Sequence, residues 1–217
     1  TKRMQLQTAI DNSKSIDTRR RFGQFATPYE LAQEIMSFGL TLLNIKKISF
    51  LEPAFGTGVF YSALLSECDK QAKSIETAIG IELDKDFFVV ANELWGNTPI
   101  NLVEGDFTET DSFEKVNLLI SNPPYVRHHY INQEQKSKLS AMAQKETGLS
   151  LSGLAGLYCY FILSAHKWLA PNAICGWLIP SEFMDVNYGG KLKEYLLNKV
   201  HLLRVHRYNP ENCKFDD

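Results

Sequence analysis

Short apolar runs alternate along the chain with segments in which apolar residues recur every three to four positions. The runs predict strands, and the segments between them predict helices. Strands are expected at residues 48–52, 78–82, 100–104, 116–121, 173–179 and 200–206, and helices at 28–43, 58–73, 85–94, 157–169 and 188–198. This alternation favours an α/β fold, a doubly wound and mostly parallel sheet with helices on both faces.

Two segments fall outside this alternation. Residues 1–26 predict a basic helical arm, followed by a helix that has Thr27 as N-cap and Pro28 at its first position. Residues 126–152 are polar and predict a loop longer than a routine connection, and such loops are more often functional than accidental. The main domain is expected over residues 27–217. It ends without a closing element, which suggests truncation.

Charge is spread unevenly along a nearly neutral chain. The 217 residues carry 23 Lys and Arg against 25 Asp and Glu, a net charge of −2. Residues 1–22 have a net charge of +4 and residues 191–217 of +2, which leaves −8 for the middle. The total does not indicate a nucleic-acid binder, and the basic run at residues 19–21 is either a DNA contact or a charged helix face.

The four cysteines are widely spaced, and none belongs to a Cys-x-x-Cys pair. This spacing argues against a disulfide framework and a zinc site, so we expect no metal and a reducing, cytoplasmic location. The sequence opens without a signal-peptide pattern, and its apolar stretches are interrupted well before the roughly 18 residues of a membrane span. We therefore expect no membrane association.

A turn with two glycines follows the first predicted strand. Gly56 and Gly58 allow positive φ and let a ligand approach the backbone where the next helix offers free amide donors. Tyr61 occupies the position of the third glycine of a dinucleotide fingerprint. The carboxylate of Glu52 suits a cationic ligand with an amino group and a sulfonium better than a pyrophosphate. A tight turn without a ligand is the alternative.

Acidic residues after the next two strands fit a nucleoside. Glu82 ends the second strand and can accept both hydroxyls of a ribose, a device that NAD enzymes share. Asp106 and Phe107 follow the third strand and offer an acceptor for an adenine amino group and an apolar face for its ring. Asp106 is also explained as a turn residue after Gly105.

The clearest chemical signal is Ser121-Asn-Pro-Pro-Tyr125, at the end of the fourth strand. An amine conjugated to an aromatic ring becomes nucleophilic when its nitrogen changes from planar toward tetrahedral. The side-chain oxygen of Asn122 and the carbonyl of Pro123 can impose that geometry, and Pro123 with Pro124 keeps the turn rigid. Tyr125 can stack on the substrate ring. The alternative is a sharp turn that only ends a strand.

These motifs occur in a characteristic order: Gly23-Gln-Phe-Ala-Thr-Pro28, Glu52-Pro-Ala-Phe-Gly-Thr-Gly58, Gly80-Ile-Glu-Leu-Asp84, Glu104-Gly-Asp-Phe107 and Asn122-Pro-Pro-Tyr125. The order resembles the amino-methylating DNA methyltransferases of restriction–modification systems. Among them it is similar to the gamma-type N6-adenine enzymes, such as the TaqI methylase and the Eco57I type. The resemblance covers roughly residues 20–217.

The resemblance implies a Rossmann-like class I catalytic domain with S-adenosylmethionine as methyl donor. It also implies a role for each matching position. The catalytic residues would be Asn122, Pro123, Pro124 and Tyr125. Thr27, Glu52, Ala54 and Gly56 would hold the amino-acid part of the cofactor, Glu82 its ribose, and Asp106 with Phe107 its adenine. Pro124 would line the same pocket.

The resemblance further implies an adenine rotated out of double-stranded DNA and stacked on Tyr125. The target-recognition domain of the family is absent, so most DNA contacts are expected from a part outside this chain. A restriction endonuclease is an expected partner or fused domain. The second aromatic of the base clamp is expected beyond the chain, and Phe183 is better explained as a packing residue.

Three hypotheses remain. The first, which we favour, is adenine-N6 methylation of DNA. The second is the same chemistry on cytosine N4, an RNA base or a protein glutamine, although glutamine methylases typically lack the Gln-Phe-Ala-Thr-Pro helix. The third is a non-catalytic nucleotide-binding module of a larger restriction protein, against which the intact motif at residues 122–125 argues.

Weaker features follow the catalytic motif. Arg127, His128 and His129 are either phosphate or base contacts or a solvated loop, and two adjacent histidines without partners do not make a metal site. Glu134 and Lys136 match half of a nuclease motif, but no acidic partner with strand context accompanies them.

Overall fold

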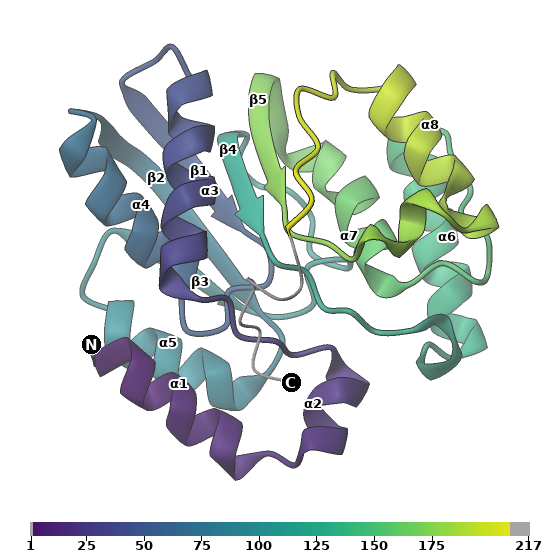
Figure 1. Cartoon of the computed structure of the whole chain (residues 1–217), viewed down its shortest axis with the longest axis horizontal. Coiled ribbons are helices and arrows are strands. Elements are labelled where there is room, and N and C mark those ends of the chain that lie inside the picture. The colour runs from purple at the N-terminus through teal and green to yellow at the C-terminus, as the bar shows by residue number, and fades with distance from the viewer. Residues whose placement is uncertain (1, 209–217) are drawn as a thin grey trace.

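Five strands form one parallel sheet in the computed structural model, which describes residues 2–208. The strand order is β3-β2-β1-β4-β5 (Figure 1), with β1 at Lys47–Glu52, β2 at Ser74–Glu82, β3 at Ile100–Glu104, β4 at Val116–Ser121 and β5 at Leu169–Trp177. The order reverses direction between β1 and β4, which is where ligands bind in open α/β sheets. The predicted doubly wound parallel fold is confirmed.

Helices cover both faces of the sheet and precede it. The described helices are α1 (Lys2–Ser13), α2 (Ile16–Phe22), α3 (Tyr29–Leu42), α4 (Val59–Lys70), α5 (Lys85–Trp95), α6 (Gln133–Thr147), α7 (Leu157–Ala165) and α8 (Gly190–Asn198). Four short 3₁₀ turns are η1 (His128–Tyr130), η2 (His166–Trp168), η3 (Ser181–Met184) and η4 (Asn187–Gly189). In Figure 1, α1 and α2 lie across the edge toward which the strand arrows point.

Alternation of side chains along β4 builds a core on each face of the sheet. Leu118 and Ile120 are buried against residues of α3 and α4. Leu119, between them, is buried on the opposite face with Phe161 of α7 and Trp168 of η2. Complete burial of such a side chain stabilises the fold by about 1.5–3 kcal/mol. A strand with both faces covered reads as a continuous apolar run, which explains why β4 was evident in the sequence.

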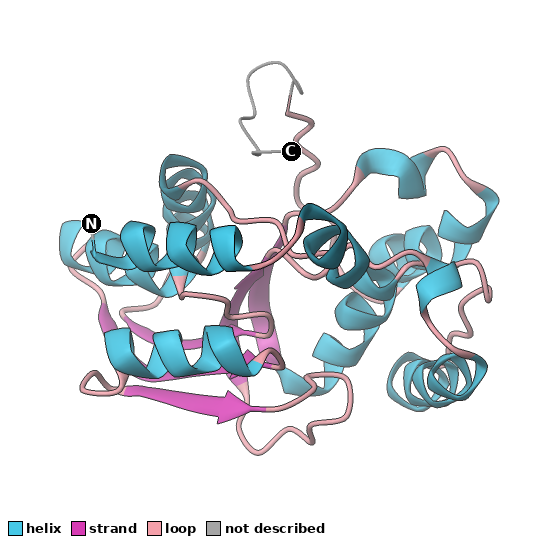
Figure 2. Cartoon of the chain, turned by 90° about the horizontal axis from the view of Figure 1, so that it is seen from below, coloured by secondary structure: helices cyan, strands magenta, loops and turns pink. Residues whose placement is uncertain are grey.

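A third apolar cluster lies beyond β5 and contains no strand residue among its fully buried members. It joins α6, α7, η3 and α8, and its buried side chains include Leu139, Leu163, Phe183, Leu192 and Tyr195. Figures 1 and 2 both show these helices grouped beside the sheet. Phe183 is therefore a packing residue, as expected.

The polar segment at residues 126–152 is not the predicted loop. It contains η1 and the fifteen-residue helix α6, whose start is fixed by a capping box between Asn132 and Gln135. The helix buries Leu139, Ala143 and Thr147 at intervals of four residues. So few apolar positions do not stand out from a solvated loop, and the prediction was wrong for that reason.

The strand predicted at residues 200–206 is also absent from the described structure, where this segment has no regular secondary structure. Leu203 and Val205 are more than half exposed. A strand needs the hydrogen bonds of a neighbour, and no described strand pairs with these residues. Alternating apolar residues alone were therefore a misleading signal.

Several element boundaries also differ from the prediction, and two of them have a clear local cause. Helix α3 begins at Tyr29 after Pro28 and has no side-chain cap, so Thr27 is not its N-cap. Strand β5 begins at Leu169 and includes Pro171, which the sequence placed between a helix and a strand. β5 is an edge strand of the described sheet, where a residue without an N–H is tolerated.

We expect Gly58→Ala to lower the free energy of unfolding by about 1–3 kcal/mol more than Gly148→Ala. Both glycines have left-handed backbones, at φ +74° and +73°. An added Cβ would lie 2.6 Å from the rings of Phe55 and Trp95 at Gly58, and meets nothing within 4 Å at Gly148. Urea denaturation of both variants measures the difference. Equal destabilisation would show that backbone conformation alone requires glycine at residue 58.

Candidate active site

A cavity of about 360 Å³ lies at the carboxyl edge of the sheet, beneath the two N-terminal helices. Parallel strands bring their carboxyl ends to one edge, which is why motifs far apart in sequence meet there. The cavity is lined by all of the residues predicted to hold the cofactor, namely Thr27, Glu52, Ala54, Gly56, Glu82, Asp106, Phe107 and Pro124, and by Asn122. Pro123 and Tyr125 adjoin it in the chain but do not line it.

The turn after β1 opens toward the cavity. Gly56 and Gly58 both have positive φ, as the sequence predicted. A Cβ on Gly56 would meet no atom within 4 Å, so the space beside this backbone is open, and Gly56 lines the cavity. A ligand can therefore approach the main chain closely at this residue.

Two buried carboxylates face the same cavity. Glu52 is 1% exposed, and its Oε2 accepts a hydrogen bond from the amide of Tyr61, 3.1 Å away, in the first turn of α4. Burial raises the pKa of Glu52 well above its usual value. Oε2 of Glu82 accepts from the amide of Gly56 at 2.7 Å and Oε1 from that of Asp84 at 2.8 Å. Burial raises the pKa of Glu82 to about 7.

These bonds orient both carboxylates without using all of their acceptor capacity. A carboxylate has about four lone-pair sites, and the two bonds to Glu82 fill two of them. The Glu82 carboxylate is thus held in place and can still accept hydroxyl donors. A ligand with positive charge favours the ionised form of both carboxyl groups and offsets the cost of burying them, so the cavity suits a cationic ligand.

Asp106 and Phe107 line the cavity and also stabilise the local structure. Oδ1 of Asp106 accepts from the amide and the hydroxyl of Thr108, at 2.8 and 2.7 Å, so this residue does form the turn that the sequence allowed. Phe107 packs against Phe161 and Trp168, with ring centroids 5.3 and 6.0 Å apart. Its ring is held rigidly beneath the cavity.

Asn122 is anchored by the segment that precedes α3. Its Nδ2 donates to the carbonyl oxygen of Phe25 at 3.2 Å and to Oγ1 of Thr27 at 3.1 Å. Because a carbonyl only accepts, the bond to Phe25 fixes which end of the amide is nitrogen. Oδ1 of Asn122 is buried and has no hydrogen-bond partner among the described residues. An acceptor is therefore held ready beside the cavity.

Tyr125 is positioned by the same segment. Its amide donates to the carbonyl of Gly23 at 3.3 Å, and its hydroxyl donates to the carbonyl of Leu178 at 3.0 Å. Its ring lies 5.7 Å from that of Phe25, and burial raises the pKa of its hydroxyl. A Cβ on Gly23 would lie 2.2 Å from the Tyr125 nitrogen, so only glycine permits this contact.

The sequence did not reveal the contribution of the N-terminal helices. Arg3, Gln7 and Asp11 of α1 line the cavity. Lys14 forms an ion pair with Asp84, and Nε2 of Gln24 donates to the same carboxylate at 2.8 Å. Helix α1 is mostly polar and its few apolar residues form no marked stripe, so the sequence did not indicate that it packs on the site.

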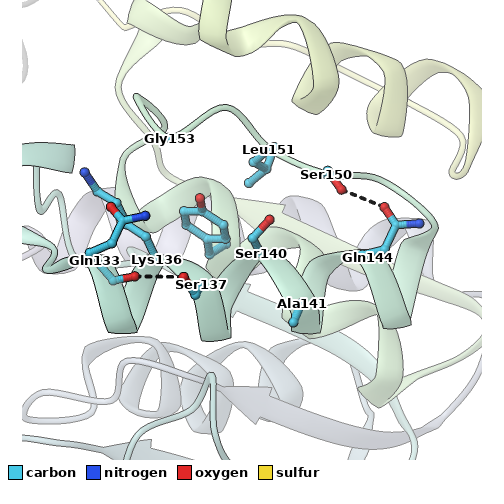
Figure 3. A pocket seen from close by; sticks show the side chains of 10 residues that line it. Gln133, Lys136, Ser137, Ser140, Ala141, Gln144, Ser150, Leu151 and Gly153 are labelled. Atoms are coloured by element: carbon cyan, nitrogen blue, oxygen red, sulfur yellow. Dashed lines mark hydrogen bonds between the residues drawn. The ribbon is translucent and has the colours of Figure 1, made fainter.

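The weaker candidates lie apart from this cavity. Arg127 and His129 are exposed, and Glu134 forms an exposed ion pair with Lys138 on α6. A second hollow, of about 510 Å³, runs along α6 and includes Lys136 (Figure 3). It is lined largely by polar side chains and contains none of the residues predicted to bind the cofactor or to act in catalysis.

Within residues 2–208, no three or more His, Cys, Asp or Glu side chains gather in a way that could hold a metal ion. Over the same residues, no helix combines the length and the apolar character that crossing a bilayer requires.

The fold has clear counterparts among solved structures. It is similar to a putative class I S-adenosylmethionine-dependent methyltransferase from Listeria monocytogenes, with a TM-score of 0.66 and 15% identity over 90% of this chain and 59% of the other. The type IIG restriction endonuclease BpuSI matches with a TM-score of 0.64 and 15% identity over 80% of this chain and 22% of the other. The architecture is that of the class I methyltransferases.

Sequence comparison identifies the family. Residues 29–213 match the family described as Eco57I restriction-modification methylase. The type II methyltransferase M.AccI of Acinetobacter calcoaceticus is 34% identical over 212 residues, which are 95% of this chain and 37% of that protein. M.XamI of Xanthomonas campestris pv. amaranthicola is 33% identical over 95 residues, 44% of this chain and 18% of that protein. The chain belongs to the Eco57I restriction-modification methylase family, and it spans less than half the length of these two relatives.

The predicted family is thereby confirmed, and with it the cofactor, because the family and the structural neighbours are S-adenosylmethionine-dependent methyltransferases. The residues of the cavity fit this molecule. Carboxylates of Glu52 and Glu82 suit its cationic amino-acid part and its ribose, and the open backbone at Gly56 leaves room for it.

We expect Glu82→Gln to remove a pH dependence of stability. Between about pH 4.5 and 7 the folded protein keeps a proton on Glu82 that the unfolded chain has released, so the free energy of unfolding falls as pH rises through this window. The raised pKa of Glu82 corresponds to a change of roughly 3 kcal/mol in the free energy of unfolding across this window. Urea denaturation of the ligand-free protein at about pH 5 and about pH 7.5 measures it.

The quantity to compare is how steeply the free energy of unfolding changes with pH. Its absolute value is less informative, because Glu82→Gln also replaces a hydrogen-bonded oxygen and so lowers stability at every pH. Glu76→Gln is the matched control, since Glu76 lies on the same strand, is half-exposed and pairs with Lys47 at the surface. Equal pH slopes in the wild type and in Glu82→Gln would contradict the assignment of a raised pKa to Glu82.

Proposed function

We propose that this domain methylates DNA within a restriction–modification system, on the exocyclic N6 of an adenine rotated out of the duplex. The observation that carries the proposal is the buried Oδ1 of Asn122, which lacks a partner while the nitrogen of the same amide makes two hydrogen bonds. Leaving a buried acceptor unsatisfied costs about 1–3 kcal/mol, and such a cost is typical of a functional group that awaits its substrate.

The acceptor has a chemical use in methylation. The lone pair of an adenine amine is delocalised into the ring, and two acceptors on its N–H groups turn the nitrogen toward a tetrahedral geometry. Asn122 Oδ1 supplies one acceptor, and the main-chain carbonyl of Pro123 supplies the second. Because the side chain is fixed by Phe25 and Thr27, the group is organised before substrate binds.

S-adenosylmethionine supplies a methyl group on a sulfonium, an electrophile that needs no further activation. The residues of the chain therefore act by positioning. The amine donates its two N–H groups to Asn122 and Pro123 and directs its lone pair at the methyl carbon. One of these protons passes to solvent after transfer. Pro124 lines the cavity together with Asn122, next to the proposed acceptor group.

Tyr125 is proposed to stack on the target base. One part of its ring is covered by Phe25, and its hydroxyl is tied to Leu178, so the ring cannot rotate freely. Rotating a base out of the duplex costs a few kcal/mol, and stacking on an immobile ring recovers part of that cost. Thr27, Ala54 and Gly56 are proposed to hold the amino-acid part of the cofactor together with Glu52, and Asp106 with Phe107 its adenine.

The acceptor is proposed to be double-stranded DNA because the chain belongs to a family of restriction-modification methylases. Most phosphate contacts are proposed to come from a target-recognition domain in the remainder of a longer protein, since the relatives extend far beyond the matched region. A restriction endonuclease is proposed as partner or fused domain, and BpuSI is a type IIG restriction endonuclease with a domain of this fold. Cys68, Cys159 and Cys175 are free thiols, which supports a reducing, cytoplasmic location.

The identity of the acceptor is tested by transfer of tritium from the labelled methyl group of S-adenosylmethionine to DNA, RNA and protein. The protein is used at its natural length, and the DNA product is digested to nucleosides. We expect label in duplex DNA, recovered as N6-methyladenosine in its deoxy form. Label in N4-methylcytosine, in RNA or in protein glutamine would show that this group, and not adenine, accepts the methyl group. The absence of any transfer would favour a non-catalytic binding module.

We expect Asn122→Ala to lower kcat by at least about 100-fold, as for other preorganised polar groups that act in a transition state. Affinity for S-adenosylhomocysteine, measured by calorimetry, should change less than about threefold, because Asn122 faces the substrate. Asn117→Ala is the control: Asn117 lies at the opposite end of β4 and bonds to the main chain of Ser49 and Lys47. Equal losses of affinity and turnover would assign Asn122 a structural role.

A further inference from the structure

A buried arginine of α1 lies in the cofactor cavity. Arg3 is 8% exposed and lines the cavity with Gln7 of the same helix. Its Nη1 donates to Oγ1 of Thr57 at 3.1 Å, and that hydroxyl donates in turn to Oε1 of Gln7 at 2.7 Å. The guanidinium is thus directed at the glycine turn after β1 and away from solvent.

The guanidinium has more donors than this bond uses. Arginine carries five N–H groups, and a buried charge is costly unless it is paired. No carboxylate of residues 2–208 forms an ion pair with Arg3. Burial lowers the pKa of Arg3, and the charge of Glu52 opposes that shift. The two groups therefore interact electrostatically.

A guanidinium and a carboxyl group that share a cavity without direct contact suit a zwitterion between them, because the ammonium of the ligand favours the ionised form of Glu52. Glu52 offers a carboxylate to an ammonium group, and Arg3 offers a planar fork to a carboxylate. The amino-acid part of S-adenosylmethionine carries both groups on one carbon. Arg3 contacts Thr57 in the turn after β1 and interacts electrostatically with Glu52 at the end of β1 and Tyr29 at the start of α3, where this part of the cofactor is expected.

We propose that Arg3 binds the α-carboxylate of the methionine part of S-adenosylmethionine, with Glu52 taking the α-ammonium. Helix α1 is then a wall of the cofactor site and not a separate arm. Lys14, which directly follows α1, forms a half-buried ion pair with Asp84 after β2 and so holds the helix on the site. The inference depends on the cofactor and is independent of which molecule accepts the methyl group.

The test compares two ligands that differ only in the carboxylate, S-adenosylhomocysteine and its decarboxylated analogue. Calorimetry without DNA gives the dissociation constants. We expect the wild type to bind S-adenosylhomocysteine about 10- to 100-fold more tightly than the analogue, the range of a charge-assisted hydrogen bond. Arg3→Met should remove that preference by weakening S-adenosylhomocysteine and leaving the analogue unchanged or tighter, because the analogue keeps its ammonium.

Arg3→Lys keeps the charge but loses the planar fork, so it should retain a preference of intermediate size. Lys2→Met is the matched control on the same helix, since Lys2 is exposed, and it should bind both ligands as the wild type does. The preference of the wild type for S-adenosylhomocysteine over the decarboxylated analogue tests the proposal even if Arg3→Met fails to fold.

Equal binding of the two ligands by the wild type would overturn the proposal. A uniform loss of both ligands in Arg3→Met would also overturn it, because that result assigns Arg3 to the docking of α1 through Thr57. Failure of methyl transfer to DNA leaves the ligand preference intact, so this inference and the proposed function are tested separately.

Discussion

The hydrogen bonds of the Asn122 side chain connect two segments that line the cavity. They join the segment at residues 23–28, which precedes the sheet, to the end of β4, ninety-five or more residues later in the chain. One amide nitrogen fixes the orientation of the whole group, and its oxygen is left for a ligand. The contact requires Gly23, because a side chain there would collide with the backbone of Tyr125. Two motifs that look independent in sequence therefore form one structural unit.

The sequence revealed those features that depend on local rules. β1, β2 and β4 are buried on both faces and read as apolar runs, and a parallel sheet gathers the residues after its strands at one edge. For this reason the sequence alone predicts that four residues lie close together: Glu52, Glu82, Asp106 and Asn122. The hydroxyl of Thr27 was assigned to a helix cap, and only the structure shows that it accepts from Asn122.

Features that depend on tertiary contacts were not predictable. Helix α6 is stabilised by a few buried positions and a capping box, and its sequence is otherwise that of a solvated segment. Residues 200–206 have the alternation of a strand, but pairing decides whether a strand forms. Arg3 lies in a helix without an apolar face, and its burial follows from the docking of α1 against α5 and the turn after β1. The sequence predicted only a basic helical arm for residues 1–26.

The internal use of basic residues affects how the N-terminal region interacts with a polyanion. Of the six cations in residues 1–22, Lys2 and Lys14 neutralise carboxylates of this same chain, and Arg3 is enclosed in the cavity. A cation already neutralised within the protein displaces no counterion from a nucleic acid. Fewer positive charges than the composition suggests are thus left in this region to attract a polyanion, and its contribution to the ionic-strength dependence of association is correspondingly small.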